Sequence, residues 1–292
     1  MSDKVSVIIN FHNGEKYLKQ SIKSVIEQYY NNFELILWDN CSTDNSLKII
    51  KSFDDSRIKY FYSNNKTTLY KARNLAVKKT SGKLIAFLDC DDWWEKNYLS
   101  SRSEFFRTDN SFYYSNTNLI FQKNNKKKLY RNFRLPNGKI IDQLVRDYFI
   151  IISGVIFKKK IFEDNIFFNE NYNIIGDYDF MMRVSSIYNG HSIDLPLVNY
   201  RVHSSNFSTL NSKMFYQEYK DWYYKNMSND FFRKNIFFLE KKLKYLEIKY
   251  LLVEDRKNIK ILKKILNYPD LFQIFKFLVL FFIPKKFYRF LR

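Results

Sequence analysis

The sequence predicts an α/β fold built on a largely parallel sheet, followed by a basic helical extension. In roughly the first hundred residues, short β-rich runs alternate with stretches of helical character, which is typical of strands joined by helical crossovers. Polar residues stand where the expected strands end, and beyond Asn211 the pattern becomes helical and strongly basic. A ligand site is therefore expected at one edge of the sheet, and a second functional region at the C-terminus.

The expected elements follow one another in a regular order. Four apolar strands are predicted at residues 5–11, 33–39, 58–63 and 83–89, separated by helices at 17–28, 44–53 and 69–79. Ser42, Thr43 and Asp44 are candidate helix caps, and Gly82 ends the third helix. The pattern then loosens into a strand at 112–122, a basic loop at 123–134, a strand at 151–157, a helix at about 177–188 and a strand at 195–203.

Composition narrows the class of protein. A chain of 292 residues with 46% hydrophobic content can bury a large core, and a formal charge of +19 favours an anionic partner, either nucleic acid or an acidic membrane surface. Two cysteines, Cys41 and Cys90, supply neither a disulfide framework nor a zinc-binding pair. The first apolar run begins at Val5 without a basic leader, so we expect a core strand there and a cytoplasmic protein.

One stretch, "LIAFLDCDDWW", contains a cluster of candidate binding residues. An apolar strand runs into Asp89, Asp91 and Asp92, and carboxylates this close repel one another unless a positive partner is present. An isolated D-x-D-D could also be a solvated helix cap. Its position after a buried strand favours a binding site.

Four blocks of sequence together resemble family 2 inverting glycosyltransferases of the GT-A fold. They occupy residues 5–46, 72–92, 176–184 and 200–208, and the second ends in the aspartate cluster. The resemblance implies a Rossmann-like mixed sheet with flanking helices. The sequence departs from the common pattern at Asn10, where Pro is usual, at His12 for Tyr, at Asn40-Cys41 for Asp-Gly, and at Gly176, where an acidic residue is frequent.

By this resemblance, the aspartate cluster would bind a nucleotide-sugar diphosphate through Mn²⁺ or Mg²⁺, the ions that hard oxygen ligands suit. The implied metal ligands are Asp91, Asp89 and His203, and the implied donor nucleotide site consists of Asn13, Asp39, Arg73 and Asp89. Asp177 would be the catalytic base, with Asp179 as an alternative, and Asp92 and Arg201 would be accessory residues. The plainer alternatives are turn or helix-end roles for Asn13, Asp39 and Asp177, a surface role for Arg73 and a structural role for His203.

The implied activity is transfer of a sugar from a nucleotide-sugar to a hydroxyl of a cell-surface glycan or lipid-linked oligosaccharide precursor. We expect the donor to be a UDP-sugar. A sugar-nucleotide-forming nucleotidyltransferase is a second hypothesis, but "NFHNGEKY" after the first strand is not its Gly- and Arg-rich phosphate loop. A basic nucleic-acid-binding protein is a third, although no base-stacking motif is recognisable. We expect no nucleic-acid partner.

The expected division is a GT-A catalytic domain at residues 1–210 and a helical, basic region at 211–292, which holds 19 Lys or Arg and 8 Asp or Glu. Its segment 271–292 begins with a 13-residue apolar run, too short to span a bilayer core of about 30 Å. We expect this segment to lie in the membrane interface, with Lys285, Lys286, Arg289 and Arg292 facing anionic headgroups on the inner face of the cytoplasmic membrane. The alternative is packing on the protein's own core or on a second subunit.

Overall fold

The computed structural model describes residues 3–107, 111–254 and 258–282. The chain divides into two compact units, residues Met1–His203 and Ser204–Arg292. The sequence prediction placed this boundary after residue 210, and the structure places it directly after His203, a predicted metal ligand.

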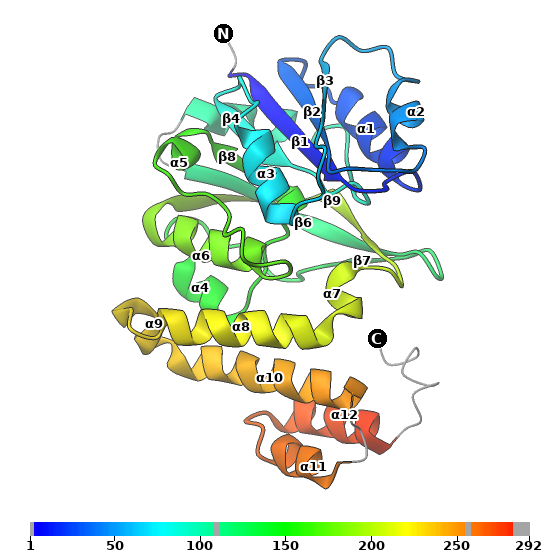
Figure 1. Ribbon diagram of the computed structural model, residues 1–292. Helices are drawn as coiled ribbons and strands as arrows, with labels where there is room; N and C mark the ends of the chain where they lie inside the picture. Colours follow the sequence, from blue (N-terminus) through cyan, green and yellow to red (C-terminus); the bar gives the residue numbers. More distant parts are fainter. Residues whose placement is uncertain (1–2, 108–110, 255–257, 283–292) are drawn as a thin grey trace. The chain divides into compact units, whose positions relative to one another are not determined.

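In the part of the first unit that the structure describes, nine strands form one mixed sheet (Figure 1). The strand order is β3-β2-β1-β4-β8-β6-β9-β5, and β7 pairs with β6. The strands are β1 (Val5–Phe11), β2 (Phe33–Asp39), β3 (Ile58–Tyr62), β4 (Leu84–Phe87), β5 (Trp93–Trp94), β6 (Ser111–Phe121), β7 (Lys126–Leu129), β8 (Val155–Lys158) and β9 (Asn189–Val202).

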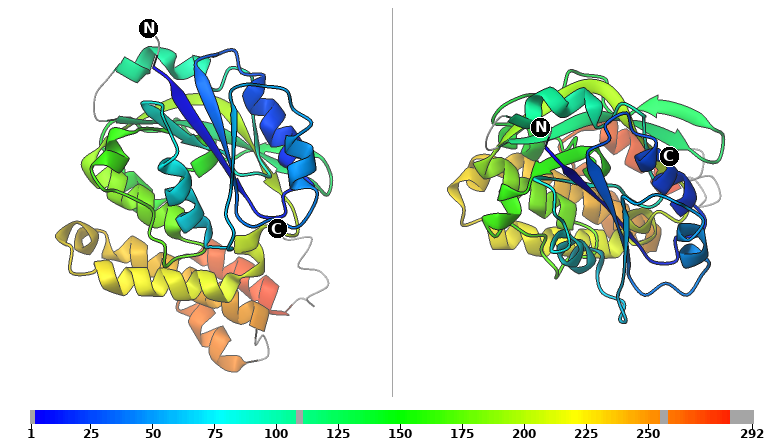
Figure 2. Two further views of the ribbon diagram at one scale, coloured as in Figure 1. Left: turned by 45° about the horizontal axis from the view of Figure 1, so that its top comes forward. Right: turned by 90° about the horizontal axis from the view of Figure 1, so that it is seen from above.

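Helices connect these strands and cover the sheet on both faces. The α-helices of this unit are α1 (Leu18–Ile26), α2 (Ser46–Ile50), α3 (Leu69–Val77), α4 (Ile141–Arg146), α5 (Lys160–Glu163) and α6 (Gly176–Ile187). The described part of the unit also has two 3₁₀ helices, η1 (Ser100–Arg107) and η2 (Ile152–Gly154). Figures 1 and 2 show α3 crossing the strand β1, as expected for the helical crossovers of a parallel sheet.

Every residue of β1 and β2 is buried, because helices cover both faces of these central strands. On one face, Val5, Val7 and Ile9 of β1 join a core with the buried side of α1, formed by Leu18, Ile22 and Val25. The apolar spacing on α1 is that of an amphipathic helix, which is why it packs here.

The parallel strands bring their carboxyl ends to one edge of the sheet. β1 pairs with β2 on one side and with β4 on the other, and the pairing continues past β4, where the Leu88 N–H donates to the Ile8 carbonyl at 2.9 Å. Asp39 at the end of β2 and Asp89 just after β4 therefore lie at the same edge, as the sequence predicts.

Most predicted strands are confirmed, but the basic segment 123–134 is not a loop throughout. It contains β7, which pairs with the end of β6 in an antiparallel hairpin. All four residues of β7 are exposed, and three are lysines, so the segment lacks the apolar alternation by which a strand is recognised. The two-residue strand β5 was also missed, and β9 begins at Asn189, before the predicted Leu195.

The second unit is helical, as the sequence predicts. Its helices are α7 (Phe207–Leu210), α8 (Ser212–Asn226), α9 (Asp230–Lys234), α10 (Ile236–Glu254), α11 (Ile259–Leu266) and α12 (Leu271–Phe282). Helices α10, α11 and α12 share a small core that includes Ile248, Leu252, Ile261, Ile265 and Phe277. Among the residues described, no helix has both the length and the apolar character that crossing a membrane requires.

Glu34 of β2 holds together several segments at the edge of the sheet opposite Asp39. Its carboxylate accepts hydrogen bonds from Lys59 Nζ and Ser6 Oγ, each at 2.6 Å, and from the Ser81 N–H at 2.6 Å. Burial alone would raise the pKa of Glu34, but these hydrogen bonds outweigh it and lower the pKa to about 2. The ionised carboxylate therefore stabilises the fold above the ordinary pKa range of glutamate.

We expect Glu34→Gln to lower the free energy of unfolding by about 1–3 kcal/mol at pH 7, because the amide cannot satisfy the same charged and backbone donors. The difference should narrow as pH falls from 4.5 towards 2, where the native carboxyl itself becomes protonated. Urea unfolding of both proteins across this range tests it, with the half-exposed Glu27→Gln as a control of small effect. A difference that is the same at pH 7 and pH 2.5 would contradict the role given to ionised Glu34.

Candidate active site

Two of the strand-end aspartates have opposite surroundings. Asp92 is buried; its Oδ2 accepts a hydrogen bond from the Ser153 hydroxyl at 2.7 Å, and its Oδ1 accepts one from the Arg201 backbone N–H at 3.0 Å. Asp91 is partly exposed, and its Oδ2 lies 2.9 Å from Nε2 of His203. Asp92 therefore holds this loop against η2 and β9, whereas Asp91 remains open to a ligand.

A buried arginine connects the third aspartate to the predicted catalytic base. The Arg73 side chain on α3 is only 1% exposed, and its two terminal nitrogens donate to Asp89 and to Asp177. Aromatic rings surround the guanidinium, with centroids 5.4–5.6 Å from its central carbon, in Tyr70, Phe87 and Phe168. A guanidinium in such a setting needs anionic partners, so it fixes both carboxylates in place.

Asp177 stands at the start of α6, the second residue of the helix. Burial raises its pKa to about 6; the Arg73 charge opposes this rise, and the neighbouring charge of Asp89 adds to it. The carboxylate also remains 27% exposed, so a substrate can reach it. A carboxylate with this pKa can accept a proton near neutral pH, as a general base must.

Gly176 departs from the usual acidic residue for a steric reason. A Cβ at this position would lie 2.4 Å from two ring carbons of Tyr70. The Tyr70 hydroxyl donates to the Ile174 carbonyl at 2.9 Å, which keeps the ring against the start of α6. The aromatic side chain and the glycine thus form a matched pair beside Asp177.

Asn13, two residues after β1, and Asp39, at the end of β2, are the predicted nucleotide-binding residues, and both shape the loop that follows β2. Asp39 accepts hydrogen bonds from the Ser42 N–H at 2.7 Å and the Tyr60 hydroxyl at 2.9 Å. Asn13 adopts a left-handed conformation with φ of 54°, and its Oδ1 accepts from the Thr43 N–H at 2.8 Å. These contacts are the turn roles that the sequence left open, and nucleotide binding by Asn13 and Asp39 stays a prediction.

The two remaining accessory residues have partners of their own. Asp179 is paired with Arg183 one turn along α6, at 2.6 Å, and is nearly buried. The Arg201 guanidinium packs over the rings of Tyr17 and Trp93, and its Nε donates to the Asp91 carbonyl at 2.9 Å. Asp179 is thus fixed on the helix, while Arg201 supports the backbone of the aspartate loop.

Several residues of this region gave no signal in the sequence. The Tyr148 hydroxyl lies 3.5 Å from the Asp177 carbonyl, and the Tyr130 hydroxyl lies 3.3 Å from the Tyr148 carbonyl. Burial raises the pKa of Tyr200 on β9, and the charges of Asp92, Asp91 and Asp89 raise it further. These tyrosines come from separate segments, and only the fold brings them together.

The donor atoms suit a hard divalent ion that shares its ligands with a diphosphate. Among the residues described, no three or more His, Cys, Asp or Glu side chains form a group that could hold a metal ion by themselves. Mg²⁺ and similar ions, however, are commonly bound by one or two carboxylates, with phosphate oxygens and water completing the shell. Asp91 and Asp89 are both partly exposed, and metal binding by them stays a prediction.

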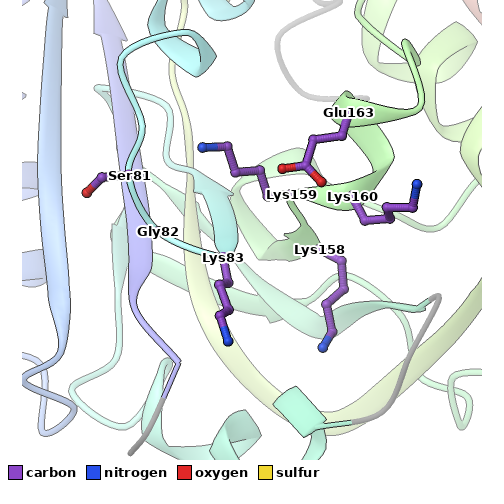
Figure 3. A pocket seen from close by; sticks show the side chains of 7 residues that line it. All are labelled: Ser81, Gly82, Lys83, Lys158, Lys159, Lys160 and Glu163. Carbon is purple, nitrogen blue, oxygen red and sulfur yellow. The ribbon is translucent and has the colours of Figure 1, made fainter.

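A separate pocket of about 360 Å³ lies at the opposite edge of the sheet, where β4 begins and β8 ends (Figure 3). It is lined by Lys83, Lys158, Lys159, Lys160 and Glu163 together with Ser81 and Gly82. Its lysines are engaged: Lys159 donates to the Thr80 carbonyl at 3.0 Å, and Lys158 donates to the Phe106 carbonyl. This pocket is distinct from the aspartate edge and holds none of the predicted site residues.

Comparison with known proteins agrees with this arrangement. Residues 6–186 match the family model described as Glycosyl transferase family 2. An uncharacterized glycosyltransferase of Rickettsia bellii is 33% identical over 214 residues, or 71% of this chain and 30% of that protein. The Escherichia coli UDP-Glc:alpha-D-GlcNAc-diphosphoundecaprenol beta-1,3-glucosyltransferase WfgD is 35% identical over 144 residues, 49% of this chain and 55% of that one. The chain thus spans about a third to a half of the length of such relatives.

Solved structures show the same fold. The crystal structure of S. aureus TarS residues 1–349 in complex with UDP-GlcNAc superposes with a TM-score of 0.63 at 18% identity, covering 95% of this chain and 71% of that one. The Pyrobaculum calidifontis mannosyltransferase PcManGT, in complex with GDP-Man and Mn²⁺, gives a TM-score of 0.56 at 14% identity, covering 76% of this chain and 64% of that one. With the family model matching more than half of its length, the chain belongs to glycosyltransferase family 2 and has the GT-A fold.

Proposed function

We propose that this protein is an inverting glycosyltransferase that moves a sugar from a UDP-sugar to a hydroxyl of a lipid-linked, cell-surface glycan precursor. The observation that carries the proposal is the Arg73 bridge, which sets a carboxylate of raised pKa, Asp177, beside the strand-end aspartates. Two relatives support the substrate class, since WfgD and WfaP of Escherichia coli are named as glucosyltransferases that use UDP-Glc and a GlcNAc-diphosphoundecaprenol acceptor.

In this proposal, Asp177 takes the proton from the acceptor hydroxyl as its oxygen attacks the anomeric carbon. Attack on the face opposite the departing diphosphate makes one direct displacement, so an α-linked donor yields a β-glycoside. Asp177 is held for this task by Arg73, and its position at the start of α6 leaves it partly exposed. Asp179 is the poorer candidate because Arg183 already holds its carboxylate.

Asp91, with Asp89 and His203 beside it, would hold Mn²⁺ or Mg²⁺. When bound, such an ion neutralises charge on the leaving nucleoside diphosphate. Asn13 and Asp39 would line the pocket for the nucleotide base at the ends of β1 and β2, and Arg73 would act on the donor through Asp89. Asp92 and Arg201 would keep the loop that carries Asp91 in position.

We further propose that the second unit attaches the protein to the inner face of the cytoplasmic membrane. Large apolar side chains on α12 are exposed, namely Leu271, Phe272 and Phe275, and Lys276 lies among them. By contrast, Phe277 is buried in the core with α10 and α11. The predicted basic tail from Pro284 to Arg292 lies outside the residues described.

We expect Asp177→Asn to lower kcat by about 10²- to 10⁴-fold while leaving donor binding nearly intact, because the amide cannot accept the hydroxyl proton. For the unchanged protein, kcat/KM should fall as pH drops through about 6, where Asp177 becomes protonated. The matched control is Asp179→Asn on the same helix, which should retain most of its turnover. If Asp179→Asn loses turnover and Asp177→Asn does not, the two roles are reversed.

We expect UDP and Mn²⁺ together to raise the unfolding temperature more than either does alone, since ligands that bind the native state stabilise it by mass action. A ligand pair at a hundred times its Kd contributes about 2.7 kcal/mol. Asp91→Ala should abolish the joint shift, whereas Asp54→Ala, at an exposed carboxylate away from the aspartate edge, should preserve it. Loss of the shift in both variants, or in neither, argues against a metal site at Asp91.

We expect the full chain to float with liposomes that contain anionic lipid and to be partly released at high salt, because only the basic part of the attachment is screened. Replacing exposed Phe272 and Phe275 by Ser should reduce flotation strongly without lowering the unfolding temperature. Phe237→Ser, at an exposed position on α10, serves as the control. Equal flotation of all three proteins would exclude α12 as the attachment surface.

A further inference from the structure

The hairpin formed by β6 and β7 extends from the same edge of the sheet as the active site (Figure 1). At the end of β6, Phe121 lies opposite Val202, the last residue of β9, and His203 follows directly after that strand. At the turn of the hairpin, Gln122 accepts a hydrogen bond from the Tyr17 hydroxyl at 2.9 Å, and the Tyr17 ring packs against His203 at 5.2 Å. One end of the hairpin is therefore anchored beside the predicted metal ligands.

The end of β7 is linked through Tyr148 to the backbone of Asp177. Directly after β7, Tyr130 and Arg131 both contact the carbonyl of Tyr148, at 3.3 Å and 2.6 Å, and Arg131 pairs with Asp147 at 2.9 Å. The Tyr148 hydroxyl in turn lies beside the Asp177 carbonyl. The turn of the hairpin thus lies next to His203, and the end of β7 is linked through Tyr148 to Asp177.

The strand register assigns the hairpin lysines to faces of the sheet. Tyr200, Leu119 and Lys128 lie opposite one another on β9, β6 and β7, so their side chains share one face. Lys126 lies in the equivalent row with Phe121 and Val202, on that same face. Lys127 alternates with these two and lies on the opposite face, with Ile120 and Arg201.

The row that ends at Lys128 starts next to the aspartate cluster, because Tyr200 directly precedes Arg201, whose backbone N–H donates to Asp92 at 3.0 Å. Two strand spacings separate Tyr200 from Lys128, or about 10 Å. A sugar ring with an attached phosphate can bridge that separation. Lys126, Lys127 and Lys128 are all exposed, and no carboxylate among the described residues lies within ion-pair distance of any of them.

We propose that Lys126 and Lys128 bind the phosphate oxygens of the acceptor, a glycan precursor linked through a diphosphate to its lipid. The proposal rests on the proposed function and adds which residues recognise the phosphate charge of the acceptor. With the diphosphate held at β7, the sugar lies over Tyr200 and Leu119, and its hydroxyl reaches Asp177. Lysine suits this task because its ammonium is a compact point charge that does not require one fixed phosphate geometry. Two lysines on one face match the two phosphates.

The test uses a short-chain alkyl diphosphate, which carries the diphosphate without any sugar, titrated into the full chain with UDP and Mn²⁺ saturating. We expect saturable binding that weakens about tenfold in the double variant Lys126→Ala/Lys128→Ala. Lys127→Ala changes the local charge on the opposite face of the same strand, and we expect less than a twofold effect. Binding of UDP and Mn²⁺ should be the same in every variant.

A second measurement uses turnover of a lipid-diphosphate acceptor and of the matched alkyl glycoside without phosphate. The double variant should raise KM for the diphosphate acceptor alone and should make that KM less sensitive to salt, with kcat unchanged. Equal losses in the double variant and in Lys127→Ala would overturn the proposal, as would alkyl diphosphate binding that the double variant retains.

The outcomes also distinguish this proposal from binding of lipid headgroups by the same lysines and from failure of the proposed function. If the double variant weakens binding to anionic vesicles but not to the alkyl diphosphate in solution, the lysines contact lipid headgroups, and the acceptor role is wrong. If the unchanged protein neither hydrolyses a UDP-sugar nor transfers from one, the proposed function fails on its own. Loss of diphosphate recognition in an otherwise active double variant supports the proposal.

Discussion

The buried Arg73 guanidinium between Asp89 and Asp177 is the interaction on which the site depends. An unpaired charge in this apolar setting would be costly, and so would two carboxylates facing one another across it. Each group therefore requires the others. Because Arg73 lies on α3 while its partners follow β4 and begin α6, this one triad fixes how three segments meet.

The triad also leaves the four carboxylates with different partners. Arg73 takes one oxygen of Asp89 and one of Asp177, and Ser153 with the Arg201 backbone satisfies Asp92. Asp91 is left with His203 as its side-chain neighbour. Four acidic groups near one edge are thus made compatible by one buried cation and a few hydrogen bonds, while negative charge remains available for a divalent ion.

The sequence predicted what depends on short-range pattern. The buried strands β1, β2 and β4 were found because their apolar runs end in turn residues, and the aspartates were found because they follow such a run. The strand β7 was missed because its three lysines carry no apolar period, and it is a strand only through pairing with β6. Likewise, neither the Tyr70 ring that requires Gly176 nor the approach of Tyr148 to Asp177 can be read from spacing, since each contact joins segments far apart in the chain.

The net charge of +19 is a weak guide to function until each lysine is examined with its partners. Lys4 and Lys59 neutralise Glu34 and stabilise the sheet, and Lys159 in the pocket at the far edge is held by a backbone carbonyl. Such lysines already have a structural task. Lys126 and Lys128 differ because they extend from a strand whose flanking residues Gln122 and Tyr130 are held by Tyr17 and Tyr148 near the aspartate edge. Position relative to the site, rather than the amount of charge, distinguishes a residue suited to bind an anionic substrate from one that stabilises the fold.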